Sequence, residues 1–133
     1  MPAQAVEIPA SQPQPPVQIK PTRPDGELTE LATRLGVTLK ELAPLLQISE
    51  STLHRARGQN ALTNPAAERA DLLMAIVEHG TRVYGGNEQA LHDWLRYPLG
   101  ELDGRTPLQA LTTIAGFTQV DDVLGRIEHG IFF

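Results

Sequence analysis

From residue 27 onward, apolar side chains recur every three or four residues, and no stretch of the chain alternates between apolar and polar residues. The first kind of spacing puts apolar side chains on one face of a helix, whereas a half-buried strand requires alternation. Leu28, Leu31, Ala32 and Leu35 are the first clear example, and Gly36 then ends that helix. The pattern therefore predicts an all-α fold.

Local start signals divide the rest of the chain into further helices. Ser, Thr and Asn at an N-cap accept hydrogen bonds from free N–H groups, and Pro suits the first helical position. Thr38 and Glu41 form a predicted capping box, although Pro44 costs up to about 3 kcal/mol in a helix interior and predicts a bend or a later start. Later starts are predicted at Ser49 for a helix to about Arg57, at Asn64 with Pro65, at Asn87, and at Thr106 with Pro107 and Gln109.

Two of these helices differ in how they should be buried. The helix from Asn64 is apolar on two sides, so we expect other helices to cover both, and Gly85 with Gly86 to end it. Its stripes are Ala70, Leu73, Met74, Val77, Thr81 and Tyr84 on one side, and Leu72, Ile76 and Val83 on the other. The helix from Thr106 is expected to end at Gly116 and to bury Leu108, Leu111, Ile114 and Ala115.

The first 26 residues have a different character. They hold seven of the eleven prolines, which remove backbone donors and favour extended chain, and they have few apolar residues to bury. We expect a disordered, proline-rich tail that serves as a linker or, alternatively, as a docking peptide. The predicted organisation is a tail over 1–26, a first module over 27–86 and a second module over 87–133.

Charge and composition exclude several classes of function. The net charge is −5, with six basic and seven acidic residues in 27–86 against three and seven in 87–133, so a contact with nucleic acid has to come from the first module. The absence of cysteine excludes disulfides and thiolate chemistry, and no segment resembles a signal peptide or a membrane span. We therefore expect a cytoplasmic protein that does not contact membranes.

The histidines and aspartates of the chain, residue types common in enzyme active sites, show no catalytic arrangement. The four histidines, His54, His79, His92 and His129, have no metal-ligand spacing. Asp121 and Asp122 fall near the start of the predicted last helix, where carboxylates favour the helix dipole. We expect no catalytic residues, no metal site and no cofactor.

Residues 38–58 have the layout of a helix-turn-helix, with a bracing helix, a turn around Ile48 and Ser49, and a polar second helix. Its alternative is a solvated helix hairpin. The side chains expected to reach DNA are Lys40, Ser51, Thr52, His54, Arg55 and Arg57. A monomer with so few cations is expected to bind DNA weakly, which predicts a homodimer on two half-sites about 34 Å apart.

The chain ends on Ile131, Phe132 and Phe133, directly after the helix-ending Gly130. Terminal aromatics of this kind either fold back onto Phe117 or Trp94, or contact a partner.

The sequence resembles the antitoxins of the Xre/ParS type over roughly four fifths of its length. The resemblance rests on LGVTLKELAPLLQISESTLHRARG (35–58), ALHDWLRYPLGELDGRTPLQALTT (90–113) and LGRIEHGIFF (124–133). It departs from the family pattern in Pro44 and in the long proline-rich tail.

The resemblance implies a type II antitoxin that neutralises a RES-domain toxin, an NAD-consuming enzyme similar to ADP-ribosyltransferases, and that represses its own operon. Trp94, Gly104, Arg105, Thr106 and Pro107 would then maintain the toxin-binding domain. The end of the chain, with Arg126, Glu128, Gly130, Ile131, Phe132 and Phe133, would block the active site of the toxin. The alternatives are a free-standing helix-turn-helix regulator whose second domain senses a ligand or dimerises, and an adaptor protein whose helix-turn-helix is vestigial.

Overall fold

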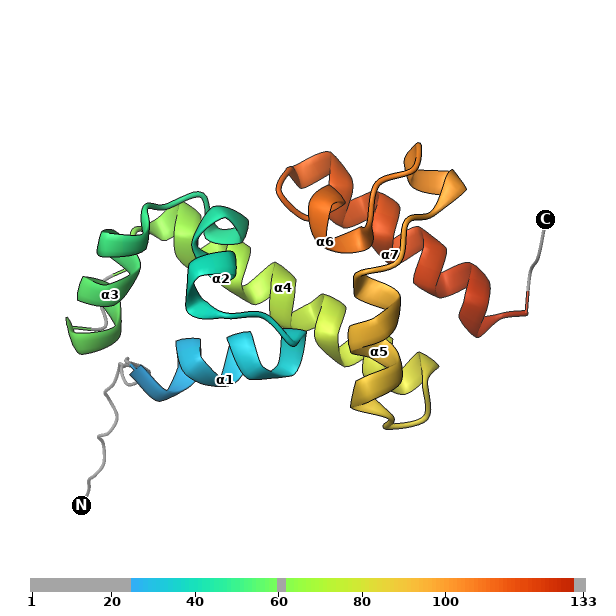
Figure 1. The fold of residues 1–133 in the computed structure, drawn as a ribbon, viewed down its shortest axis with the longest axis horizontal. Helices are drawn as coiled ribbons and strands as arrows, with labels where there is room; N and C mark the ends of the chain where they lie inside the picture. The colour runs from blue at the N-terminus through green and yellow to red at the C-terminus, as the bar shows by residue number, and fades with distance from the viewer. Residues whose placement is uncertain (1–24, 60–61, 131–133) are drawn as a thin grey trace, which may run out of the picture.

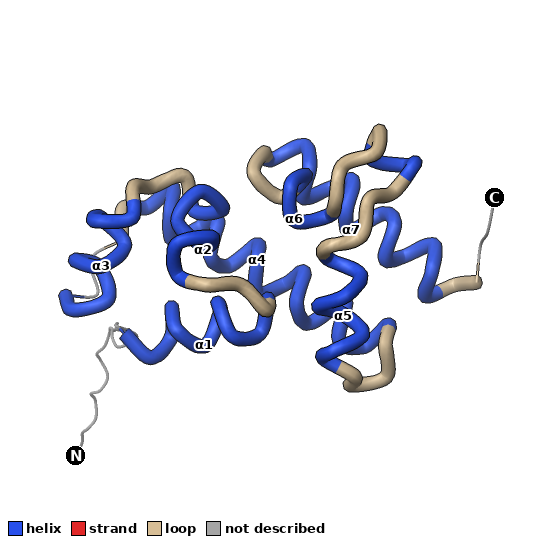
Figure 2. Tube along the Cα trace, in the orientation of Figure 1, coloured by secondary structure: helices blue, strands red, loops and turns tan. Residues whose placement is uncertain are grey.

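The computed structural model describes residues 25–59 and 62–130, and within them it contains helices and loops but no strand (Figure 2). The all-α prediction is confirmed. The helices are α1 (Asp25–Leu35), α2 (Leu39–Leu46), α3 (Glu50–Gln59), α4 (Asn64–Val83), α5 (Glu88–Leu95), α6 (Pro107–Ala110) and α7 (Ile114–Glu128), with a short 3-10 helix at Gly100–Leu102. None of the described helices combines the length and apolar content needed to cross a membrane.

The long helix α4 forms the axis of the molecule, with α1 to α3 around one end and α5 to α7 around the other (Figure 1). It packs against α1, α2, α5 and α7. Leu73 and Val77 of the first predicted stripe and Ile76 of the second are buried, so the prediction that this helix is covered on two sides is confirmed only in part. Leu72, which we placed in the second apolar stripe, remains 39% exposed.

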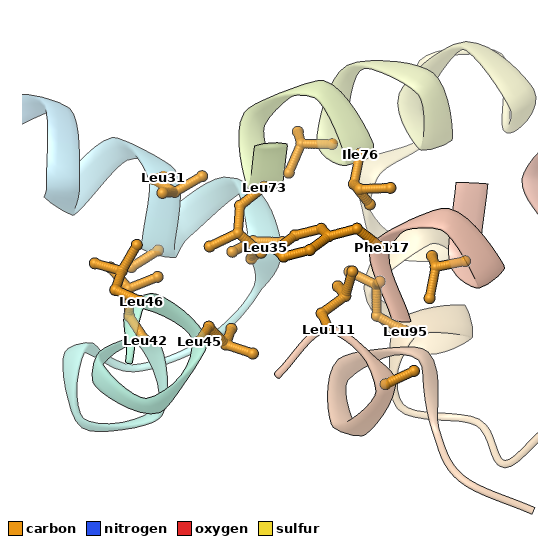
Figure 3. Packing of buried hydrophobic residues seen from close by; sticks show 14 of the residues in the cluster. Leu31, Leu35, Leu42, Leu45, Leu46, Leu73, Ile76, Leu95, Leu111 and Phe117 are labelled. Atoms are coloured by element: carbon orange, nitrogen blue, oxygen red, sulfur yellow. The ribbon is translucent and has the colours of Figure 1, made fainter. Parts of the chain in front are cut away.

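One continuous apolar core joins the two ends of the molecule. Phe117 of α7 points across this core toward Leu35 of α1, with Leu73 and Ile76 of α4 beside it (Figure 3). Leu35 and Leu73 are fully buried, and Phe117 is almost so. Burying such side chains stabilises the fold by about 1.5–3 kcal/mol each, so the core ties the first half of the chain to the second.

The predicted capping box at the start of α2 is confirmed. Thr38 accepts a hydrogen bond from the N–H of Glu41 (3.1 Å), and the Glu41 carboxylate accepts one from the N–H of Thr38 (2.9 Å). The helix therefore begins at Leu39, and Pro44 does not delay its start. Lys40 and Pro44 are both exposed, so the carbonyl that Pro44 leaves without an intrahelical donor lies on the solvent side of α2.

The region around Gly116 corrects the sequence prediction. The helix that begins after Thr106 ends at Ala110, and α7 begins at Ile114 with Thr113 as its N-cap, so Gly116 lies inside α7 rather than ending the previous helix. Ile114 is 55% exposed and Ala115 is exposed as well, although we expected both to be buried. The apolar spacing continues across this break, whereas the hydrogen bond from the Gly116 N–H to the Thr113 hydroxyl (3.0 Å) determines where α7 starts.

Other predicted boundaries move by a few residues. Residues 25 and 26, assigned to the tail, form the start of α1, and the rest of the predicted tail lies outside the described residues. Gly58 does not end α3, which extends to Gln59. Thr63 rather than Asn64 caps α4, while Asn87 caps α5 as predicted. The division of the chain into modules at residue 86 stays a prediction.

Candidate functional site

Helix α3 carries most of the predicted DNA contacts and lies at one end of the molecule (Figure 1). Its apolar edge, Leu53 and Ala56, is buried, and α3 packs against both α1 and α2. The Ser49 hydroxyl caps the helix by accepting a hydrogen bond from the N–H of Thr52 (3.1 Å). The bracing helix α2, together with α1, thus supports α3, as a helix-turn-helix requires.

The polar side chains of α3 form a network along the helix. Arg55 donates to the Thr52 hydroxyl (3.3 Å), and Nη1 of Arg57 lies 3.4 Å from Nδ1 of His54. Nε2 of His54 lies 3.9 Å from the carboxylate of Glu50, which lowers the positive potential of this surface. The predicted contacts are thus distributed with Ser51, His54 and Arg55 exposed on α3, Thr52 and Arg57 half-buried on α3, and Lys40 exposed on α2.

The predicted toxin-binding residues lie in two environments. Trp94 is 9% exposed and belongs to the core, so it maintains the fold around it. Arg105 donates to the carbonyl of Leu102 (3.0 Å) and to the side chain of Gln119 (3.2 Å), which holds the loop after the 3-10 helix against α7. The remaining described positions lie at the end of α7: Arg126 is half-buried, and Glu128 and Gly130 are exposed.

Ile131, Phe132 and Phe133 lie outside the described residues, so their predicted packing or partner contact stays a prediction. The described chain before them ends in an ordinary helix terminus. The N–H of His129 bonds to the carbonyl of Gly125 (3.0 Å), and Gly130 has a φ of 71°, a conformation that favours glycine.

Sequence analysis did not find a cluster centred on His79. Its Nδ1 lies 2.7 Å from a carboxylate oxygen of Asp121, and its Nε2 lies 2.9 Å from one of Glu128. Asp121 therefore sits in the middle of α7 and pairs with α4, instead of lying at a helix start as we expected. The signal was not visible in the sequence because His79 and its partners are more than 40 positions apart.

The two carboxylates stabilise the charged form of His79. Burial lowers its pKa, but the hydrogen bonds with Asp121 and Glu128 raise the pKa by more, so the net pKa lies above its usual value of 6.5. Both ring nitrogens can donate at once only when the imidazole is protonated. The same contact with His79 lowers the pKa of Glu128, to which Arg82 and His129 also contribute.

This shift predicts a pH dependence of stability. Because the pKa of His79 is raised in the folded chain, its stabilising effect is complete below about 6.5 and is lost as the pH rises through the folded-state value. His79→Ala should therefore reduce the free energy of unfolding more at about pH 6 than at about pH 9. Urea denaturation at both pH values measures the difference, and Asp121→Asn should reduce it. An equal loss at both pH values would contradict the pairing of His79 with the two carboxylates.

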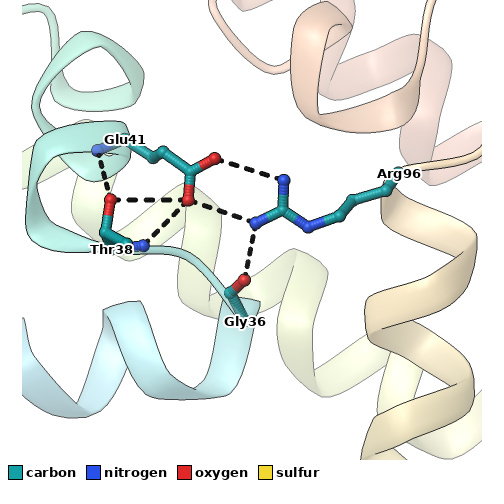
Figure 4. A network of polar contacts seen from close by, with 4 residues as sticks. All are labelled: Gly36, Thr38, Glu41 and Arg96. Carbon is teal, nitrogen blue, oxygen red and sulfur yellow. Dashed lines mark hydrogen bonds and ion pairs between the residues drawn. The ribbon is translucent and has the colours of Figure 1, made fainter.

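A third set of polar contacts joins the C-cap of α5 to the turn after α1 and to the first turn of α2. Arg96 donates to both carboxylate oxygens of Glu41 (3.1 and 3.2 Å) and to the carbonyl of Gly36 (2.8 Å), as Figure 4 shows. The hydrogen bond from Arg96 is the main reason why the pKa of the Glu41 carboxyl lies below its usual value, followed by the bond from the N–H of Thr38. Nothing in the sequence pattern predicted this pair, which is separated by 55 residues.

A groove of about 380 Å³ lies beside this pair, between α2 and α6. Its apolar walls come from Val37, Pro44, Leu45 and Leu108, and its polar walls include Glu41, Arg96, Thr106, Gln109 and Thr112. Within residues 25–59 and 62–130, no group of three His, Asp or Glu side chains is placed to hold a metal ion.

Comparisons with known families match both halves of the chain. Residues 27–75 match the antitoxin Xre-like helix-turn-helix domain, and residues 79–130 match the antitoxin Xre/MbcA/ParS C-terminal toxin-binding domain. Proteins with these domains are regulatory and non-enzymatic. The first match includes all of α2 and α3, and the second includes α5, α6 and α7.

Two curated relatives carry the name Antitoxin Xre. The one from Yersinia enterocolitica is 29% identical over 84 residues, which are 63% of this chain and 57% of that protein. The one from Photorhabdus laumondii is 29% identical over 77 residues, which are 58% of this chain and 52% of that protein. The chain thus spans little more than half the length of the curated relatives that it matches. On the two domain matches and these relatives, the chain belongs to the Xre/MbcA/ParS antitoxin family.

Proposed function

We propose that this protein is a type II antitoxin that binds and neutralises a toxin of the RES class in the cytoplasm. The observation that carries this proposal is the match of residues 79–130 to a toxin-binding domain, in a chain that also matches a helix-turn-helix over residues 27–75. The RES identity of the toxin comes from the sequence resemblance, which implies an NAD-consuming enzyme similar to ADP-ribosyltransferases.

The proposed inhibition is steric. A protein without catalytic groups inhibits an enzyme by occupying its surface, and small-molecule sites are concave pockets that a short apolar segment can fill. In this chain, Arg126 and Glu128 lie in the last turn of α7, and Ile131, Phe132 and Phe133 follow two residues after the helix ends. The apolar end would enter the active-site cleft of the toxin. Arg126 and Glu128 would then lie at the rim of the interface, which is usually polar.

The opposite end of the molecule would bind DNA. We propose that a homodimer places two copies of α3 in successive major grooves, about 34 Å apart, and represses the operon that encodes the chain. The two candidate surfaces, on α3 and at the end of α7, lie at opposite ends of the fold (Figure 1). One chain can therefore hold DNA and a toxin at the same time.

The toxin proposal is tested by co-expressing the chain with the product of the adjacent reading frame. The expected result is that the neighbouring protein arrests growth when expressed alone, that the chain restores growth, and that the two proteins purify as a complex. A neighbouring protein that arrests growth equally well with the chain present and does not bind it would contradict the proposal.

The DNA proposal predicts the effect of removing the two cations of α3. Arg55→Ala with Arg57→Ala should weaken binding to the duplex upstream of the operon. It should also lower the slope of log affinity against log salt concentration by about 4, because each of the two subunits loses two phosphate contacts and each contact contributes about 1 to the slope. Fluorescence anisotropy over a range of salt concentrations measures both quantities. Arg82→Ala, an exposed position outside the helix-turn-helix match, is the control. An unchanged slope in the double variant would place the DNA contact elsewhere.

A second candidate function is a free-standing regulator that senses a small ligand, and the groove between α2 and α6 favours it. The two charged groups in that groove, Glu41 and Arg96, are hydrogen-bonded to each other. A ligand therefore has to compete with an existing ion pair, which makes the groove a poorer explanation of the chain than the toxin-binding match.

A further inference from the structure

One face of α5 is polar and points toward the first half of the molecule. Glu88 and His92 of α5 and Arg96 at its C-cap follow one another at intervals of four residues, a spacing that puts side chains above one another on a helix. All three contact the end of α1 or the turn after it. Glu88 pairs with Arg34 (3.4 Å), and a ring nitrogen of His92 lies 3.0 Å from the carbonyl oxygen of Arg34. Arg96 completes the row at the carbonyl of Gly36 (2.8 Å).

These contacts satisfy groups that α1 cannot satisfy alone. The last carbonyls of a helix have no intrahelical donor, and cations are favourable beside them. Here the donors come from a helix more than 50 positions later in the chain. Gly36 has a φ of 72°, and a Cβ atom there would lie 2.6 Å from the His92 ring, so α5 approaches the turn closely.

Arg96 also reaches the start of the bracing helix of the motif. Its second partner, Glu41, is the residue that closes the capping box of α2, and both side chains of this pair are nearly half exposed. Helix α2 packs against α3. Arg96, in the toxin-binding half, thus binds Glu41, the residue that fixes the start of α2 in the DNA-binding half.

We propose that Arg96, supported by His92 and Glu88, is a positioning residue for DNA binding that acts from within the toxin-binding half. It fixes the turn at Gly36 and the first turn of α2, and through α2 it sets the orientation of α3. This inference rests on the proposed DNA-binding function, because operator affinity is the quantity that Arg96 is expected to change.

The test compares full-length Arg96→Ala and Arg96→Lys with the wild-type chain. DNA affinity is measured by fluorescence anisotropy with the duplex upstream of the operon, and thermal unfolding is followed in parallel. We expect Arg96→Ala to weaken DNA binding about fivefold. The melting temperature should change little, because an exposed ion pair contributes little to the stability of the fold. Arg96→Lys keeps the charge without the two-pronged contact and should restore part of the affinity.

A double-mutant cycle identifies the partner. Glu41→Gln keeps an oxygen for the capping box but removes the charge that Arg96 binds. If the pair positions α3, Glu41→Gln combined with Arg96→Ala weakens DNA binding no further than Arg96→Ala alone. Fully additive losses would contradict the assignment. Wild-type DNA affinity in Arg96→Ala would also contradict it. So would a loss of DNA affinity that is matched by a loss of melting temperature and that Arg96→Lys does not restore.

The positioning role is separable from the proposed DNA binding. If the wild-type chain does not bind the duplex at low salt, the DNA-binding proposal fails, and the amide chemical shifts of α3 then decide the positioning role. The positioning role would be supported if Arg96→Ala changes the amide chemical shifts of Thr52 and Arg55. These changes should be smaller in Arg96→Lys and absent in Arg82→Ala. An α3 spectrum identical to the wild type would overturn it.

Discussion

Gly116→Ala is expected to lower the free energy of unfolding by about 3 kcal/mol, at the upper end of the usual cost of overpacking. A Cβ atom at this buried position would lie 1.6 Å from the carbonyl oxygen of Ala110, which belongs to the backbone. The neighbour is therefore not a side chain that can rotate away, and α6 and α7 have to separate. Urea denaturation followed by circular dichroism measures the loss.

Gly125 of the same helix is the matched control. A Cβ atom there meets nothing within 4 Å, so Gly125→Ala should leave stability unchanged or raise it by up to about 1 kcal/mol. If Gly116→Ala unfolds at the same urea concentration as the wild type, the close approach of α6 to α7 is wrong.

Deletion of Ile131, Phe132 and Phe133 is expected to weaken toxin binding about 100-fold while the melting temperature stays within a few degrees. Buried aromatic anchors each contribute about 2 kcal/mol or more to an interface, and 1.4 kcal/mol corresponds to a factor of ten. The fully buried core of the described residues ends at Leu124, with Ile127 packed against it, so we expect the fold to tolerate this deletion. Isothermal titration calorimetry with the purified toxin measures the affinity.

Removal of residues 2–24 is the control for this truncation, because it shortens the chain at the other end. We expect that variant to bind the toxin as the wild type does. Equal affinities for the wild type and the variant lacking residues 131–133 would show that the apolar end does not block the toxin.

The helix starts could be predicted from the sequence because N-caps are local. Thr38 with Glu41 and Thr106 with Gln109 each bond within three residues, so the sequence contains both partners of each bond. The start of α7 could not be predicted in this way. Thr113 is an equally good cap, but the apolar spacing from Leu108 to Ala115 continues across it, and the contact between Gly116 and Ala110 is visible only in three dimensions.

The candidate sites divide along the same line. The polar side chains of α3 lie within seven residues of one another, so their common helix could be predicted. Arg96 with Glu41 and His79 with Asp121 instead join positions that are 55 and 42 residues apart. Sequence spacing carries no information about such pairs. The first pair connects the two halves of the chain, and the second fixes α7 on α4. Together they determine how the two candidate surfaces are held relative to each other.

We propose that this protein acts by covering the surfaces of other macromolecules and performs no chemistry of its own. The most direct test measures NAD consumption by the product of the adjacent reading frame while the purified chain is added in increasing amounts. We expect NAD consumption to fall to zero at a fixed molar ratio and the chain alone to leave NAD intact. Undiminished NAD consumption in the presence of excess chain would contradict it.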